Sequence, residues 1–178
     1  MAQLYQLHIQ ELLTYGYRMT TNRSLIKDSI QDLFLHLWHF RQTIGETTSV
    51  KFYLYRSLRN RIVRNLGYTK WEISGTGNVL EEALSDLPLE AGWMAEESSR
   101  EQAARLRQAL QKLSKRQQEA IQLRYYHDFS PAEIAQLMEI NYQSVRNLLH
   151  QALEHLRKHW GTYGFVVLLQ AEVWKNTF

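Results

Sequence analysis

One face of a helix expected over residues 49–66 carries side chains that could bind nucleic acid. At about 100° per residue, a polar and basic face lies opposite a largely aliphatic one. The polar face holds Tyr53, Arg56, Asn60, Arg61 and Arg64. The opposite face, expected to be buried, holds Leu54, Tyr55, Leu58, Ile62 and Leu66. Arginine binds phosphates, tyrosine stacks on unpaired bases and asparagine bonds base edges, so the polar face predicts nucleic-acid contact. The alternative is a basic face that contacts only water, but residues 51–71 contain no acid to balance it.

A second candidate for nucleic-acid binding lies in residues 130–160. Ser130 and Glu133 have capping-box spacing and Pro131 suits a first helical turn, so a short helix is expected over 131–138. A turn of about four residues and a long helix to about Trp160 follow, which is the helix-turn-helix arrangement, although ordinary helical hairpins look similar. The first residues of the second helix reach base edges in such motifs. They are Tyr142, Gln143, Ser144, Arg146, Asn147 and His150. Val145, Leu149, Ala152 and Leu156 are expected to pack inward.

Other chemistry finds little support in the sequence. The pairs His36–His39 and His155–His159 have metal-ligand spacing, but the chain has no cysteine and no acidic ligand at a matching distance. Asp28 and Asp32 share a helix face and are interpreted as an exposed surface for a protein partner. There is no phosphate-binding glycine loop and no nucleophile elbow. We therefore predict no enzyme activity, no cofactor and no metal.

The elements that must position these faces are all expected to be helices. The 178 residues are 44% hydrophobic with only two prolines and eight glycines, which argues against a turn-rich β fold. Apolar spacing predicts helices over 3–19, from Ser24 as N-cap to about residue 40, and over 49–66. The core stripe of the second helix is Ile26, Ile30, Leu33, Phe34 and Leu37, with Arg41 at its end. A helix through Ala103, Leu106, Leu110 and Leu113 precedes one over about 115–127, capped by Ser114 and Gln117.

Charge and glycine content divide the chain into two small helical domains. Net charge is +3, yet residues 51–71 carry six basic side chains and no acid, while residues 72–99 carry seven acids and no base. We predict an all-α protein with domains over 1–67 and 100–160, an acidic linker over 68–99 and a tail over 161–178. No stretch reaches the roughly 18 apolar residues of a membrane span, and the start lacks a signal-peptide pattern, so a cytoplasmic protein is expected.

Several stretches resemble the conserved regions of bacterial sigma factors. Residues 28–38 (DSIQDLFLHLW) and 52–60 (FYLYRSLRN) are similar to region 2. Residues 113–126 (LSKRQQEAIQLRYY) and 129–135 (FSPAEIA) are similar to region 4. With no further domain between them, the pair resembles the extracytoplasmic-function group. Leu148 and Gln151 stand where that family often has basic residues, and Gln143-Ser144 replaces a commoner glycine–threonine entry.

The resemblance implies a dissociable subunit that guides core RNA polymerase to promoter DNA. In that family, region 2 reads and melts the −10 element and region 4 reads the −35 element. It implies that the first polar face lies beside the opened −10 strand and that the second lies on the −35 element. Polymerase docking would involve Asp28, Gln31, Asp32, Leu35 and Trp38, and a flipped base would enter the loop over 41–48. The acidic linker would thread the RNA path, and an anti-sigma factor is a further candidate partner.

Two other classes of protein remain open from the residues alone. The chain could be a free-standing helix-turn-helix regulator that binds an operator without polymerase. It could also be a helical adaptor whose basic face meets an acidic protein. A separate basic and aromatic helix in another domain is of no use to an operator-binding regulator, which usually dimerises on a palindrome.

Overall fold

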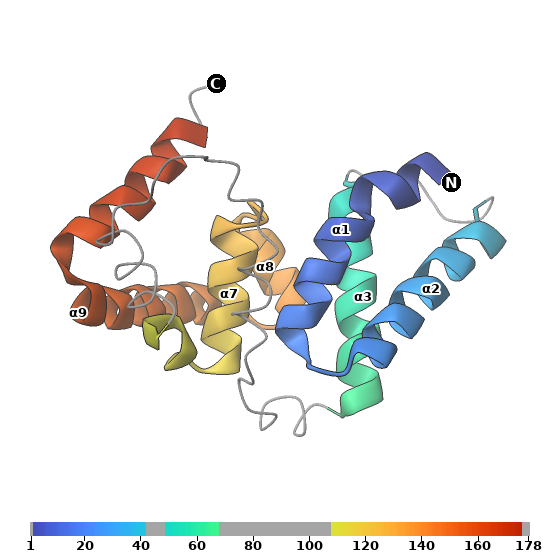
Figure 1. Ribbon diagram of the computed structural model, residues 1–178, viewed down its shortest axis with the longest axis horizontal. Coiled ribbons are helices and arrows are strands. Elements are labelled where there is room, and N and C mark those ends of the chain that lie inside the picture. The colour runs from blue at the N-terminus through green and yellow to red at the C-terminus, as the bar shows by residue number, and fades with distance from the viewer. Residues whose placement is uncertain (1, 42–48, 68–107, 176–178) are drawn as a thin grey trace, which may run out of the picture. The chain divides into compact units, whose positions relative to one another are not determined.

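The computed structural model describes residues 2–41, 49–67 and 108–175, with side chains to residue 158 (Figure 1). The predicted linker over 68–99 and the predicted base-capture residues 42–48 lie outside these ranges. The chain divides into unit 1, Met1–Ala83, and unit 2, Leu84–Phe178. Every regular element in the described ranges is a helix, so the all-α prediction is confirmed.

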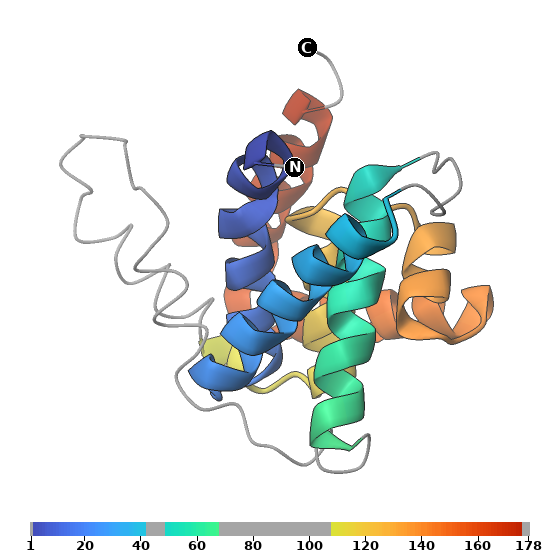
Figure 2. The same cartoon turned by 90° about the vertical axis from the view of Figure 1, so that its right-hand side faces the viewer.

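Unit 1 contains α1 (Ala2–Met19), α2 (Arg23–His39) and α3 (Val50–Leu66), and each packs against the other two (Figures 1 and 2). The fully buried side chains between them are Leu12, Tyr15, Ile26, Leu33, Leu54, Tyr55, Leu58 and Ile62. The core predicted for α3 is therefore confirmed except for Leu66, which is half-buried. Burial of these apolar side chains stabilises the orientation of the α2 and α3 outer faces.

Local hydrogen bonds decide where the helices of unit 1 begin. The Asn22 side chain accepts from Leu25 N at 3.0 Å and caps α2. The prediction of Ser24 as the cap was wrong, because Ser24 lies inside the first turn and donates to Asp28 Oδ2 at 3.3 Å. Ser49 caps α3 by accepting from Phe52 N at 3.1 Å, as its hydroxyl permits.

Two features fix α1 against its neighbours. A Cβ on Gly16 would lie 2.6 Å from Ile26 Cγ2, so glycine allows α1 to approach the buried and β-branched Ile26 closely. On the other side, Glu11 Oε2 accepts from the Tyr55 hydroxyl at 3.3 Å and lies 3.6 Å from Lys51 Nζ. These polar contacts tie α3 to α1 beside the apolar core.

Unit 2 contains helical residues 108–111, then α7 (Lys115–Tyr125), α8 (Pro131–Met138) and α9 (Tyr142–Lys175). Both predicted capping boxes are present, Ser114 with Gln117 and Ser130 with Glu133. The predicted inward residues of α9 are all buried, namely Val145, Leu149, Ala152 and Leu156. Ala152 and Leu156 form a cluster with Ala109 and Leu113, so α9 packs on the residues that precede α7.

Helix ends in unit 2 depart from the sequence prediction in two places. α7 ends at Tyr125, two residues early, before Asp128 adopts a φ of 59°. α9 continues to Lys175, so the prediction that it ends near Trp160 was wrong. Gly161 and Gly164 cost only about 1 kcal/mol each in a helix, and the following leucine, glutamine and alanine residues favour one.

The turn of the helix-turn-helix depends on a strained residue. Glu139 caps α8 in the left-handed region, with φ 55° and ψ 43°, and Ile140 N donates to Ala135 O at 3.0 Å. A side chain with a Cβ is disfavoured in this region, whereas glycine is not.

We expect Glu139→Gly to raise the free energy of unfolding of unit 2 by about 0.5–1 kcal/mol. This gain is the backbone strain that glycine relieves, minus the additional conformational entropy that glycine loses on folding. Glu139→Ala, which keeps the Cβ, should bring no such gain. Thermal unfolding followed by circular dichroism measures both variants. Equal stability of the two variants would contradict the backbone explanation.

Candidate nucleic-acid and partner interfaces

The polar face of α3 lies on the outside of unit 1. Arg56 and Arg64 are exposed, and Tyr53 and Asn60 are half-buried at its borders. Arg61 is partly covered, and its Nη1 lies 3.9 Å from Asp32 Oδ2 on α2. The structure therefore brings the five predicted side chains onto one helix surface, with Arg61 engaged across to the neighbouring helix.

One basic residue of this helix does not belong to the surface. Arg59 is only 2% exposed and is enclosed with the core residues of α3. Counting charge along the sequence places it in the basic block, but helical spacing puts it beside Tyr55 and Ile62. The basic surface is therefore smaller than the charge count indicates.

The five residues predicted on α2 for a protein partner are all exposed. Leu35 and Trp38 are 48% and 51% exposed, which is unusual for large apolar side chains. Arg41 lies 4.5 Å above the Trp38 ring and donates to the Trp38 carbonyl at 2.7 Å. Asp28, Gln31 and Asp32 complete this surface one to two turns earlier. An apolar patch bordered by polar groups is typical of a binding surface.

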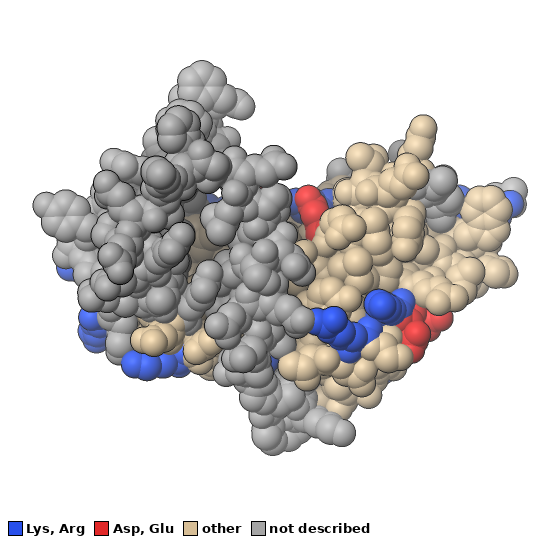
Figure 3. All heavy atoms as spheres, in the orientation of Figure 1, with Lys and Arg blue, Asp and Glu red and all other residues tan. Residues whose placement is uncertain are grey.

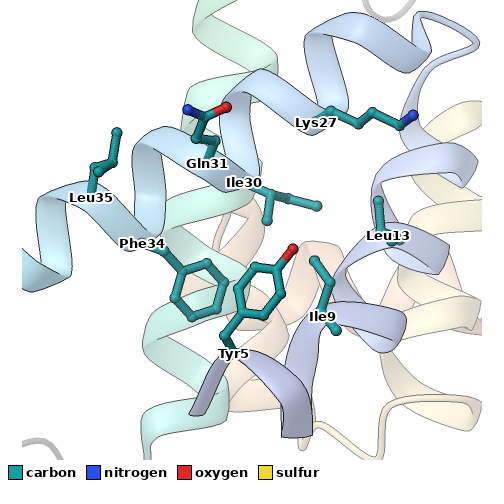
Figure 4. Close-up of a pocket in the computed structure, with 8 residues that line it drawn as sticks. All are labelled: Tyr5, Ile9, Leu13, Lys27, Ile30, Gln31, Phe34 and Leu35. Carbon is teal, nitrogen blue, oxygen red and sulfur yellow. The ribbon is translucent and has the colours of Figure 1, made fainter. Parts of the chain in front are cut away.

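A groove of about 510 Å³ runs between α1 and α2 beside this surface (Figure 4). Its lining consists of Tyr5, Ile9, Leu13, Lys27, Ile30, Gln31, Phe34 and Leu35. The Tyr5 and Phe34 rings meet edge to face with centroids 5.0 Å apart. Gln31 and Leu35 belong both to this groove and to the α2 surface, so the two features are continuous. Sequence reasoning missed the α1 residues, because their neighbourhood with α2 depends on the packing of the two helices.

The start of α9 presents its predicted side chains to solvent. Tyr142 is 51% exposed, and Gln143, Arg146, Asn147 and His150 are exposed as well. Ser144 is half-buried, and its backbone N–H donates to Asn141 Oδ1 at 2.7 Å. These residues lie on the first turns of a helix whose opposite face is buried, as a groove-reading helix requires.

Amide side chains form a second feature of the α9 surface. Gln143 Nε2 donates to Asn147 Oδ1 at 3.0 Å, and Gln117 Nε2 donates to Gln151 Oε1 at 3.4 Å. Partial burial lowers the pKa of the nearby Lys115 below its ordinary value.

On the face drawn in Figure 3, basic side chains (blue) reach the surface at several places among the described residues.

Of the two histidine pairs, His36–His39 has described side chains, whereas His159 of the pair His155–His159 lies beyond them. Among the described residues, no group of three His, Cys, Asp or Glu side chains lies close enough to hold an ion. His39 Nδ1 lies 3.1 Å from the Leu35 carbonyl, and the His36 ring packs on Phe40 at 4.6 Å. None of the described helices has the length and apolarity to cross a membrane.

Comparisons with known proteins match both units. The model of Sigma-70 region 2 matches residues 4–72, and that of Sigma-70, region 4, matches residues 103–156. RNA polymerase sigma factor YlaC of Bacillus subtilis is 28% identical over 160 residues, covering 88% of this chain and 89% of that protein. ECF RNA polymerase sigma factor SigL of Mycobacterium tuberculosis is 27% identical over 158 residues, covering 88% and 86%.

A solved structure supports the fold. The sigma factor RpoE of Bartonella quintana, solved in complex with the anti-sigma factor NepR, has a TM-score of 0.59 at 18% identity and covers 88% of this chain and 94% of that chain. The two matched regions and the helical units define the class, and the chain belongs to the sigma-70 family. Its relatives place it in the extracytoplasmic-function group, so the resemblance seen in the sequence is confirmed.

Proposed function

We propose that the chain is a transcription initiation factor that binds core RNA polymerase through α2 and reads promoter DNA with α3 and α9. One observation carries this proposal: the exposed faces of α2, α3 and the start of α9 all lie within the residues that match the two sigma regions. The chain acts by binding and orienting macromolecules, and its place of work is the cytoplasm, where polymerase meets DNA. A free-standing regulator is not favoured, because unit 1 also belongs to the family.

The α3 face is the proposed site for the opened −10 strand. Tyr53 offers a ring for base stacking, Asn60 an amide for a base edge, and Arg56 and Arg64 charges for phosphates. Arg61 lies at the border with α2, where its guanidinium is 3.9 Å from the Asp32 carboxylate. A surface that combines stacking with phosphate contacts suits a single strand better than a closed duplex.

The α2 surface and the adjoining groove are the proposed polymerase-docking site. Gln31, Leu35 and Trp38 supply an amide and two apolar anchors, while Asp28 and Asp32 supply negative charge at the border. Buried apolar anchors with a charged rim are the usual composition of a protein interface. An anti-sigma factor that covered this surface would compete directly with polymerase.

The start of α9 is the proposed −35 reader. Arg146→Ala or Asn147→Ala should weaken promoter binding by about 1–3 kcal/mol and relax the preference at one or two base pairs. The loss follows because each exposed side chain offers a donor to a base edge in the major groove. Binding to a panel of single-base promoter variants measures both effects. Unchanged affinity and preference would contradict the assignment of α9.

The proposed function is tested by mixing the purified chain with core RNA polymerase and separating the mixture by gel filtration. We expect the two to elute together as a stable complex. Separate elution would contradict polymerase binding and would favour an operator-binding regulator. Binding of the chain to duplex DNA in the absence of polymerase would then identify that alternative.

A further inference from the structure

A line of hydrogen bonds leads from the start of α7 to the outer side of α9. The backbone N–H of Ser114 donates to Gln117 Oε1 at 3.0 Å within the capping box of α7. Gln117 Nε2 in turn donates to Gln151 Oε1 at 3.4 Å. The two glutamines come from helices that pack on each other, so the line connects two fixed elements.

These bonds determine which way each carboxamide points. A backbone N–H can only donate, so the oxygen of Gln117 must face Ser114 and its NH₂ must face Gln151. Gln151 accepts with its oxygen, so its own NH₂ is not used in the bond to Gln117. Because Gln151 is exposed, this NH₂ presents donors to the surface beside the proposed DNA-reading turns of α9.

We propose that Gln151 donates to a DNA phosphate and that Gln117 is the positioning residue that aims it. The proposal rests on the DNA-reading role proposed above for α9. Phosphate oxygens only accept hydrogen bonds, so they match an amide whose oxygen is already occupied and whose NH₂ remains to donate. Glutamine is among the side chains that contact DNA phosphates.

The place of Gln151 on α9 favours the DNA backbone over a base edge. Gln151 lies nine residues after Tyr142, which is about 13 Å along the helix axis. Side chains that read bases come from the N-terminal end of a recognition helix, so a residue this far along lies toward the rim of the groove. In this chain a neutral, oriented amide thus stands where the family often has a basic residue.

The variant Gln117→Glu separates positioning from folding. Glutamate can still accept from Ser114 N, since it is the usual partner of serine in a capping box, but it has no NH₂ for Gln151. We expect an unchanged thermal unfolding midpoint with an affinity for promoter DNA lowered about fivefold. Gln151→Ala should lower the affinity by a similar factor, that of one lost hydrogen bond.

A double-mutant cycle removes the effect of the added negative charge. In a Gln151→Ala background, Gln117→Glu should cost less affinity than in the parent, because the group it positions is already absent. An equal loss in both backgrounds would overturn the positioning role. Binding by Gln151→Ala at the parent's affinity would overturn the phosphate contact.

Replacing promoter phosphates one at a time by uncharged methylphosphonates identifies the contact itself. We expect one position at which the methylphosphonate lowers the affinity of the parent protein. At that same position it should not lower the affinity of the Gln151→Ala variant any further. If Arg146→Ala also leaves binding unchanged, the role proposed for α9 fails. If Arg146→Ala weakens binding and no phosphate position depends on Gln151, only the present inference fails.

Discussion

Leu35→Asp and Trp38→Ala should each weaken the binding of core RNA polymerase by about 30-fold or more. Exposed apolar side chains that become buried at the centre of an interface contribute about 2 kcal/mol or more when truncated. Leu35 also adjoins the α1–α2 groove, so an aspartate there would place an unpaired charge in an apolar contact. Titration of labelled protein with core polymerase measures the loss.

Leu7→Asp is the matched control for this prediction. Leu7 is 73% exposed on α1 and does not line the groove, so its replacement should leave polymerase binding unchanged. All three variants keep the buried core, and circular dichroism should report the helix content of the parent for each. If Leu7→Asp weakens binding as much as Leu35→Asp, the docking surface is not the one proposed.

Tyr53→Ala, Arg56→Ala and Asn60→Ala should each reduce open-complex formation on duplex promoter DNA by about tenfold. Stacking of one base on an aromatic ring is worth about 1–3 kcal/mol, and a lost phosphate or base contact has a similar size. On a template with a pre-opened bubble the losses should be smaller, since the cost of unpairing is already met. Permanganate footprinting of unpaired thymines measures the opening.

Asn65→Ala provides the control on the same helix. Asn65 is exposed but lies outside the polar face, so both templates should open as they do with the parent. Equal losses on duplex and bubble templates for Asn60→Ala would contradict strand capture by α3. Such a result would point to lost polymerase docking or to misfolding.

Helical periodicity and cap chemistry account for what the sequence could predict. Apolar residues three and four apart give the buried sides of α3 and α9, because a helix that packs on one face imposes that spacing. Two capping boxes mark helix starts, Ser114 with Gln117 and Ser130 with Glu133. Their side chains accept hydrogen bonds from backbone N–H groups at the helix start that have no partner within the helix. The start of α9 therefore displays the predicted polar residues to solvent.

The features that the sequence did not predict depend on contacts between helices. Burial of Arg59 follows from the packing of α3 in unit 1. The Tyr5 wall of the groove follows from the packing of α1 on α2. Asn22 and Ser24 are both good caps, and only the backbone decides between them. The length of α9 escaped prediction because single glycines weaken a helix without ending it.

Promoter selection from a random DNA library by core polymerase with this chain tests the central claim most directly. The account predicts that the DNA upstream of the sequenced transcription starts shares two separate motifs, near −10 and −35. Asn60→Ala should change only the downstream motif, and Asn147→Ala only the upstream one, because the two residues lie on separate units. Starts without a shared motif, or one motif altered by both variants, would contradict a sigma factor that reads two promoter elements.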